Sequence, residues 1–243
     1  DFYRLYQEYG CSLQIGGGDQ WGNLTSSLEL IRKKETNAQA EVFSVKLITD
    51  SEGRKFGKSE RGALYLNPDM CSPYYIYQYF INVSDLDFAR YIRIFDDRDL
   101  DDIQKDIDKH NACPERRLGQ KQLAYLIVSQ LHSSAVADDC VKMSEALFQN
   151  SFSDLSESQV LEVAEGITHF DSDESELNIL DALIKVNLAK SRREGREFVS
   201  NGSVRINGEK IQDVEYVIKN GEGLYGNMFF IRRGKKSYAF LKF

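Results

Sequence analysis

Two short segments of this 243-residue chain carry residue types that suit nucleotide chemistry. The first is QIGGGDQWGN at 14–23, in which three glycines directly follow a short apolar run. Glycines after a strand let a ligand approach the backbone closely, and the start of a following helix favours nearby negative charge. Asp19 and Gln20 stand where open α/β sheets bind ligands, and a carboxylate there can accept hydrogen bonds from ribose hydroxyls. A purely structural turn would use the same glycines, and the absence of GK[ST] argues against a P-loop.

The second segment is KFGKS at 55–59, where Lys55 and Lys58 flank a glycine in a polar stretch. Such a loop can close over a triphosphate and neutralise the charge that develops as pyrophosphate leaves. Stabilisation that is stronger in the transition state than in the ground state accelerates the reaction. A solvated basic turn is the simpler interpretation of these five residues taken alone.

The elements that must position these segments form the first of three blocks, residues 1–71. A short apolar run at 11–15 predicts a buried strand, and apolar residues spaced by three and four predict a helix over Trp21–Lys34. Residues 42–48 read as a second strand, followed by a polar loop at 49–59. Strand, glycine turn and helix in this order predict an α/β sheet.

The second block, residues 72–166, is predicted to be all-α. Ser72 before Pro73 is an N-cap with proline at the first helical position, and Pro114 is expected to open a further helix. Ser156 with Gln159 fits a capping box. The acidic residues 167–176 are interpreted as a linker.

The third block, residues 177–243, is predicted to be a small α+β domain. Ser191 with Glu194 fits another capping box, and Asn207-Gly208 joins two short strands as a tight hairpin. The residues 229–238 read as two strands around a basic turn.

Charge is distributed unevenly, and this pattern suggests a polyanionic partner for the third block. Residues 177–243 contain 13 Lys+Arg and 7 Asp+Glu, a net of +6, whereas the whole chain carries −7 and the remainder therefore −13. A basic surface without a partner would give the same count. The candidate RNA-binding residues are Arg192, Arg193, Arg196, Arg232, Arg233, Lys235 and Lys236.

Other classes of function find little support in the sequence. No apolar run is long enough for a membrane helix, and the first residues are not a signal peptide. The four cysteines have no CxxC pair, which favours reduced thiols in the cytoplasm. His110, His132 and His169 are isolated, so we expect no protein-bound metal.

The two motifs, in this order and with these flanking blocks, resemble the tyrosyl-tRNA synthetases of bacterial type, which are class I aminoacyl-tRNA synthetases. KFGKS is similar to their form of the KMSKS loop, and the resemblance covers essentially the whole chain. It implies the second half of a Rossmann-like catalytic domain over 1–71, an anticodon-side helical domain over 72–166 and a small RNA-binding domain over 177–243.

The resemblance implies specific roles around the tyrosine substrate. Asp1 matches the aspartate that receives the phenolic hydroxyl. Gln14 matches a glutamine on the strand that lines the amino-acid pocket, and Gln20 one near the tyrosine carboxylate. A buried acceptor for the phenol would be left unpaired by phenylalanine, which costs affinity.

It also implies roles around ATP. Gly17 and Asp19 match the residues that hold the adenylate ribose. Lys55, Lys58 and Ser59 match the mobile catalytic loop that stabilises the ATP phosphates. The reaction so implied forms tyrosyl-adenylate from L-tyrosine and ATP with Mg²⁺, and then transfers the tyrosyl group to tRNA(Tyr), in a cytoplasmic homodimer without a membrane partner.

The sequence departs from the family because it contains no HIGH-type motif and no counterpart of the first half of the nucleotide-binding fold. We therefore expect these 243 residues alone to be inactive in tyrosine activation. One alternative is a non-catalytic, synthetase-derived RNA-binding protein, although such a protein has no need for Lys55 and Lys58. A tryptophanyl enzyme is the other alternative, and Asp1 together with the basic third block favours the tyrosyl enzyme.

Overall fold

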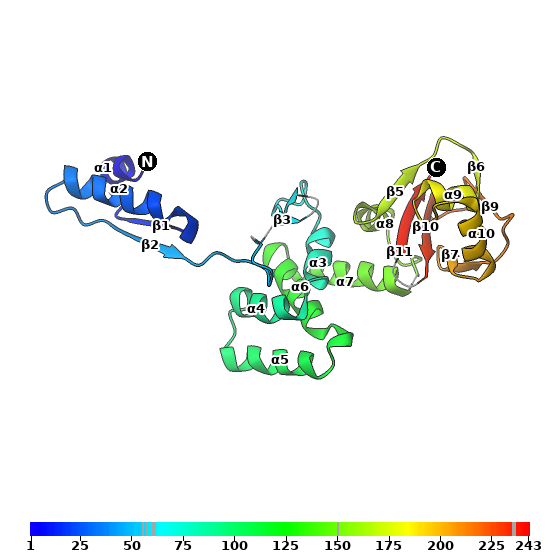
Figure 1. Ribbon diagram of the computed structural model, residues 1–243, viewed down its shortest axis with the longest axis horizontal. Coiled ribbons are helices and arrows are strands. Elements are labelled where there is room, and N and C mark those ends of the chain that lie inside the picture. The colour runs from blue at the N-terminus through cyan, green and yellow to red at the C-terminus, as the bar shows by residue number, and fades with distance from the viewer. Residues whose placement is uncertain (55, 57, 60–61, 150, 235–236) are drawn as a thin grey trace. The chain divides into compact units, whose positions relative to one another are not determined.

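The computed structural model describes residues 1–54, 56, 58–59, 62–149, 151–234 and 237–243 (Figure 1). The chain divides into two compact units, residues 1–63 and residues 64–243. Each unit mixes helices with strands or hairpins and is described separately below. None of the described helices is long and apolar enough to cross a membrane.

The first unit contains a small α/β layer. Its elements are α1 (Phe2–Tyr9), β1 (Leu13–Gly17), the single turn η1 (Gly18–Gln20), α2 (Trp21–Lys34) and β2 (Glu41–Val45). The two strands pair in parallel, with Leu13 opposite Glu41, and α2 packs on both (Figure 1). Buried Phe2, Ile31 and Ala40 form the core between helices and strands. The predicted order of strand, glycine turn and helix is confirmed, and α2 has the predicted bounds. The strands are shifted from the predicted ranges 11–15 and 42–48, and the prediction that the first is buried is wrong, because Leu13 and Ile15 are exposed.

A two-strand hairpin ends the first unit. Its strands are β3 (Lys58–Ser59) and β4 (Gly62–Ala63), with Lys58 opposite Ala63. Lys55, which was predicted to act in the same loop, lies outside the described residues. The polar loop of the sequence analysis is therefore partly ordered backbone.

Helices make up the first part of the second unit. They are α3 (Pro73–Ile81), α4 (Asp85–Phe95), α5 (Leu100–Ala112), α6 (Leu118–Leu131), α7 (Ser134–Gln149) and α8 (Glu157–Glu165). The most extensive contacts join α6 to α3 and α7. Both predicted caps are present: Ser72 Oγ accepts the backbone N–H of Tyr75, and Ser156 with Gln159 makes a reciprocal capping box.

The helix expected to open at Pro114 begins later. Residues Pro114–Arg116 form a single 3₁₀ turn, η2, and Arg117 then adopts a left-handed conformation with φ 53° before α6 starts at Leu118. The Arg117 guanidinium donates to the carbonyl oxygens of Ile81 and Val83. These hydrogen bonds satisfy carbonyl oxygens at and just after the end of α3, and they hold Arg117 in its turn. Because the partners are more than 30 residues away, the local sequence pattern does not predict the later start of α6.

An ion pair between the buried Asp96 carboxylate and the partly exposed Arg98 closes the loop between α4 and α5. The Asp96 side chain is 2% exposed and accepts from Arg98 Nε and Nη2 at 3.0 and 2.6 Å. The same guanidinium reaches Asp106 on α5 at 2.8 Å. The Arg98 hydrogen bonds, above all, lower the pKa of Asp96.

Replacing Asp96 with asparagine is expected to lower the free energy of unfolding at neutral pH by about 2 kcal/mol, a typical value for hydrogen bonds to charged groups. Because the pKa of Asp96 is lowered on folding, its contribution is present above the unfolded pKa and is lost as pH falls through the folded pKa. Urea unfolding at pH 7 and at pH 3 should therefore show a difference between wild type and Asp96→Asn that shrinks in acid. Asp97→Asn, at the exposed neighbouring position, is the matched control. A pH-independent difference would contradict this account.

The second part of this unit is a small domain built on a five-stranded sheet. The strand order is β5–β11–β10–β7–β8. The strands are β5 (Thr168–Asp171), β7 (Val204–Ile206), β8 (Glu209–Ile211), β10 (Met228–Arg233) and β11 (Ser237–Lys242), and β6 (Glu176–Asn178) pairs with β9 (Val217–Lys219) beside them.

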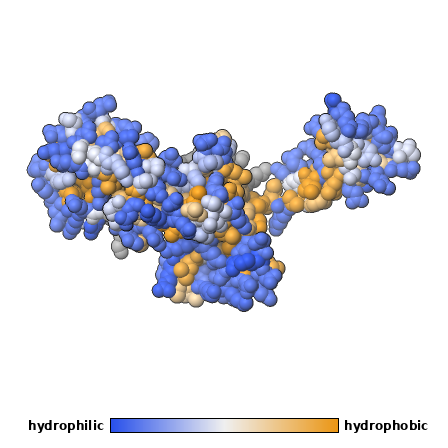
Figure 2. Space-filling view, turned by 180° about the vertical axis from the view of Figure 1, so that it is seen from behind, coloured by the Kyte–Doolittle hydropathy of each residue, from blue (hydrophilic) through white to orange (hydrophobic). Residues whose placement is uncertain are grey.

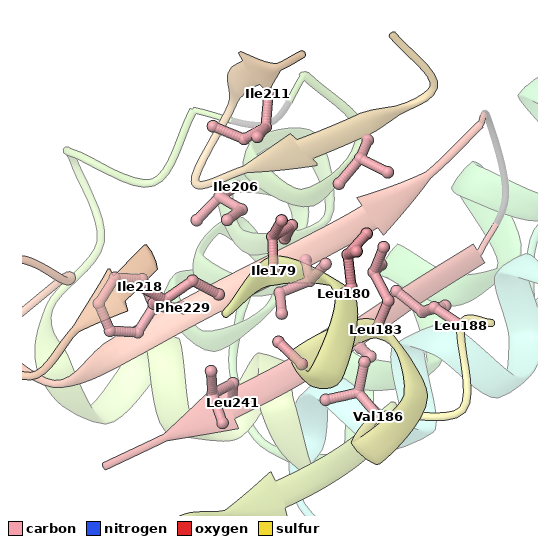
Figure 3. Packing of buried hydrophobic residues seen from close by; sticks show 14 of the residues in the cluster. Ile179, Leu180, Leu183, Val186, Leu188, Ile206, Ile211, Ile218, Phe229 and Leu241 are labelled. Carbon is pink, nitrogen blue, oxygen red and sulfur yellow. The ribbon is translucent and has the colours of Figure 1, made fainter. Parts of the chain in front are cut away.

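Helices α9 (Ile179–Lys185) and α10 (Arg192–Ser200) cover one face of this sheet. Figure 3 shows Ile179, Leu180 and Leu183 of α9 in one apolar cluster with Phe229 and Leu241 of the sheet. Alternate residues face the other side, where Phe230 stacks on Phe152 with ring centroids 4.2 Å apart. Successive side chains of β10 therefore point to opposite faces of the sheet, and both faces are packed.

The turn chemistry of the small domain agrees with the sequence. Asn207 and Gly208 have φ angles of 47° and 95° and join β7 to β8 as the predicted hairpin. The strands predicted around the basic turn are β10 and β11, which pair antiparallel.

The interpretation of residues 167–176 as a linker is wrong for half of its length. Residues 168–171 form β5, an edge strand parallel to β11, and Glu176 begins β6. Phe170 packs against the domain core, while the acidic residues lie on the solvent side. One apolar side chain and a row of backbone hydrogen bonds therefore outweigh the polar composition.

Candidate functional site

The glycine turn after β1 is shaped by its own neighbours. A Cβ on Gly16 would lie 3.3 Å from Leu24 of α2, and a Cβ on Gly17 would lie 2.8 Å from the Asp19 carboxylate and 2.9 Å from Leu47. These two glycines therefore allow α2 and the segment after β2 to pack closely on the strand. At Gly18 the nearest atom is a carbonyl oxygen at 3.8 Å, so space remains at this third glycine.

Polar side chains stand along β1 and at its carboxyl end. Gln14 on β1 buries its Oε1, which has no hydrogen-bond partner within the described residues. Asp19 and Gln20 follow in η1 and are exposed, and Gln20 Oε1 accepts from Asn23 at 2.9 Å. A buried acceptor without a partner costs free energy, and a ligand donor would relieve that cost.

The first helical turn of α2 lies beside this end of β1. Gln20 occupies the N-cap position of α2 and makes no side-chain cap bond. Such a helix end carries partial positive charge and suits an anionic ligand group. The carboxyl end of β1 therefore combines acceptors for hydroxyl groups with donors for an anion.

Asp1 occupies the N-cap position of α1. Its side chain is exposed and makes no capping hydrogen bond. The buried Phe2 next to it anchors α1 on α2, which fixes the start of the helix. The described residues do not place the Asp1 carboxylate against Gln14 or Gln20.

A clamp that the sequence analysis missed precedes the KFGKS segment. Asp50 Oδ1 accepts the backbone N–H groups of Glu52 and Arg54, and Asp50 Oδ2 accepts from Arg54 Nε at 2.6 Å. The Arg54 hydrogen bond is the main cause that lowers the pKa of Asp50. Backbone hydrogen bonds from Phe56 to Ile48 and from Asp50 to Arg54 complete the turn. The D-x-x-G-R spacing of Asp50 to Arg54 is the signal that could have identified it.

The clamp fixes the chain just ahead of the candidate catalytic residues. Lys58 and Ser59 lie in β3, and their backbone is the part described. The clamp therefore orders the turn that directly precedes this hairpin.

The candidate RNA-binding residues of the small domain differ in exposure and in their contacts. Arg193 and Arg196 are exposed on α10, whereas Arg192 pairs with Asp181 of α9 at 2.7 Å. Arg232 lies over the Tyr238 ring and Arg233 over the Phe198 ring, at 5.3 and 4.9 Å. Lys235 and Lys236 lie outside the described residues.

One face of the β1–β2 pair is apolar and uncovered. Leu13, Ile15, Phe43 and Val45 are each between 45% and 54% exposed. Figure 2 shows apolar surface gathered along this unit, on the right. Parallel sheets are ordinarily covered on both faces, so this face has the character of a core surface.

The described residues contain no group of three or more His, Cys, Asp or Glu side chains arranged to hold a metal ion. The acceptors at the end of β1 and the lysines of KFGKS instead suit a nucleotide ligand.

Two family models match the chain in succession. The model for "tRNA synthetases class I (W and Y)" matches residues 1–149. The model for "Tyrosine--tRNA ligase SYY-like C-terminal domain" matches residues 159–241.

Curated relatives match over the full length of this chain. A tyrosine–tRNA ligase of Streptococcus agalactiae serotype Ia is 42% identical over 244 residues, which cover 100% of this chain and 58% of the relative. A tyrosine–tRNA ligase of Streptococcus gordonii is 39% identical with the same coverage. The chain therefore spans somewhat more than half the length of these relatives.

Two solved structures are similar to parts of this chain. A C-terminally truncated mitochondrial tyrosyl-tRNA synthetase of Coccidioides posadasii is 30% identical, with a TM-score of 0.47 over 58% of this chain and 41% of that one. A solution structure of a tyrosyl-tRNA synthetase C-terminal domain is 26% identical, with a TM-score of 0.34 over 38% of this chain and 93% of that one.

Proposed function

This chain belongs to the tyrosyl-tRNA synthetases, within the class I tRNA synthetase family, and we propose that the whole protein attaches L-tyrosine to tRNA(Tyr) at the expense of ATP. Tyrosine attacks the α-phosphate of ATP, which arrives with Mg²⁺, and tyrosyl-adenylate and pyrophosphate form. A ribose hydroxyl of the 3′-terminal adenosine of the tRNA then attacks the tyrosyl carbonyl, and AMP leaves. We further propose that the enzyme works as a cytoplasmic homodimer.

The observation that carries this proposal is the set of polar groups along β1 and beyond its carboxyl end. Gln14 on the strand buries an unpartnered oxygen, and the exposed Asp19 precedes α2, whose N-cap residue makes no side-chain cap bond, on the same chain as KFGKS. Acceptors for hydroxyl and ammonium groups together with donors for a carboxylate or phosphate suit an aminoacyl-adenylate. A binding protein without catalysis would not require the lysine pair.

Roles follow for the residues at this site. Gln14 and Gln20 line the amino-acid side of the pocket, and Asp1 receives the phenolic hydroxyl. Gly17 and Asp19 hold the adenylate ribose.

The phosphate loop follows the clamp at Asp50. Lys55, Lys58 and Ser59 stabilise the ATP phosphates, and the ion pair between Asp50 and Arg54 holds the base of their loop. No side chain needs to act as a covalent nucleophile, because the reaction relies on positioning and charge stabilisation.

The uncovered face of the β1–β2 pair is relevant to which segments of the whole protein the reaction requires. We propose that further parts of the whole protein cover Leu13, Ile15, Phe43 and Val45 and complete the sheet. The chain spans 58% of the length of its curated relatives, so other segments are available for this purpose. On this proposal the 243 residues alone do not activate tyrosine.

The small basic domain supports tRNA binding. Its net charge of +6 and the exposed Arg193 and Arg196 suit contacts with RNA phosphates. Arg192 is held by Asp181, so we expect it to contribute less to RNA affinity than its two neighbours on α10.

Tyrosine-dependent exchange between ATP and pyrophosphate tests the proposed reaction. We expect the whole protein to catalyse exchange with tyrosine and not with tryptophan, and the 243-residue chain to give only background. Binding of tRNA by a whole protein that catalyses no exchange would support the alternative, a synthetase-derived RNA-binding protein. Exchange with tryptophan would contradict the assignment of the substrate.

A further inference from the structure

The small domain contains an open pocket of about 640 Å³ where α10 meets the ends of β10 and β11. Glu194, Phe198 and Asn201 line it from α10 and the turn that follows, and Ser203 and Arg233 line it from the sheet side. Residues 194, 198 and 201 share one face of the helix because they are spaced by four and three. The pocket lies beside the exposed Arg193 and Arg196 in the sequence of α10 but has a different chemistry.

An aromatic ring and an arginine form one wall. The Arg233 guanidinium lies 4.9 Å from the centre of the Phe198 ring, and its Nη1 donates to the Leu188 carbonyl at 2.7 Å. The carbonyl bond fixes the plane of the guanidinium, and packing against the core restrains Phe198. Flat, fixed π surfaces of this kind are where unpaired bases stack in RNA complexes.

Side chains that can hydrogen-bond to the edge of a base form the rim of the pocket. Asn201 Oδ1 accepts from both the backbone N–H and the hydroxyl of Ser203, so its amide group offers N–H donors to a ligand. Glu194 Oε2 accepts the Lys190 N–H at 2.6 Å, and a carboxylate retains further acceptor capacity. The rim therefore contains donors and acceptors at fixed places.

The carboxylate distinguishes this pocket from a phosphate site. Glu194 would repel a phosphate group that entered the pocket, whereas it can accept from the amino or imino groups of a base. The basic residues of α10 outside the pocket suit the backbone of the same RNA.

We propose that this pocket receives one unpaired nucleobase of the bound RNA, an inference that rests on the proposed binding of tRNA by this domain. Phosphates contact the exposed arginines of α10, and the extruded base lies against Phe198 and Arg233. The base edge meets Glu194 and Asn201. The pocket thus adds recognition of an unpaired nucleotide to charge-based affinity.

The test compares two synthetic RNA hairpins, one with a single bulged 2-aminopurine and one in which that nucleotide is paired, both binding to the full 243-residue chain. We expect the wild type to bind the bulged hairpin about tenfold more tightly, in line with the stacking of one base. Phe198→Leu keeps an apolar side chain and Arg233→Lys keeps the charge. Both should bring the ratio of the two affinities close to one.

Arg193→Gln is the control for charge. It should weaken binding of both hairpins by the same factor, reduce the salt dependence of binding and leave the ratio unchanged. Equal binding of both hairpins by the wild type, or an unchanged ratio in Phe198→Leu and Arg233→Lys, would overturn the pocket while leaving RNA binding intact. Failure of the wild type to bind either hairpin would overturn both the pocket and the RNA-binding role.

Discussion

On the proposed function, replacing Lys58 with alanine in the whole protein is expected to slow formation of tyrosyl-adenylate by about 10²–10³-fold, the usual effect of removing one group that stabilises transition-state charge. Lys58 lies in the β3–β4 hairpin, after the clamp formed by Asp50 and Arg54. The ammonium group can follow the departing pyrophosphate, on which negative charge accumulates as the α–β phosphate bond breaks. Its interaction is therefore stronger in the transition state than with bound ATP.

Single-turnover kinetics of adenylate formation, measured separately from tRNA affinity, can test this expectation. The affinity for tRNA should be unchanged, because the basic residues assigned to RNA lie in the small domain. Lys46→Ala removes an exposed lysine from the segment between β2 and the clamp and should leave the rate near that of wild type. Equal rates in Lys58→Ala and the wild type would refute the role of Lys58.

The clamp illustrates what the average composition of a segment does not reveal. The polar run after Ile48 was interpreted as a loop because its composition is hydrophilic. In the structure, Asp50 accepts two backbone N–H groups and pairs with Arg54. The Asp50 and Arg54 side chains thus order a segment whose hydrophilic composition predicts no ordered structure.

Local patterns predicted the elements well wherever the local chemistry sufficed. The apolar spacing of α2, the Ser72 and Ser156 caps and the Asn207-Gly208 turn depend on residues within a few positions of one another. They were therefore readable without knowledge of the fold.

The misses share a long-range cause. Residues 168–171 became a strand because β11, some 70 positions later, offers an edge to pair with. Arg117 turned left-handed because its side chain binds the end of α3. The candidate site divides in the same way: the glycine turn and KFGKS could be read from the sequence, whereas the unpartnered oxygen of Gln14 required coordinates.

Gly119 on α6 provides the most demanding test of the packing in the helical part. A Cβ at this position would lie 2.4 Å from Cε1 and Cζ of Phe88, whose side chain is fully buried. The Phe88 ring packs edge-on against buried His110, with centroids 4.9 Å apart, so it has little room to move. The close approach of α6 to α4 therefore depends on glycine, which has no side chain, at position 119.

Gly119→Ala should consequently lower the free energy of unfolding by about 3 kcal/mol, the upper part of the usual range for overpacking, although alanine favours helix more than glycine does. Urea unfolding followed by far-UV circular dichroism measures the change. Gly195→Ala in α10 is the matched control, because its Cβ would meet neighbours only at ordinary distances of 3.5 Å or more, and it should be neutral or slightly stabilising. The double variant Gly119→Ala with Phe88→Leu should be less destabilised than the sum of the two single variants, because the smaller side chain relieves the clash. Additive effects would show that the cost of the Gly119 substitution arises elsewhere than at Phe88.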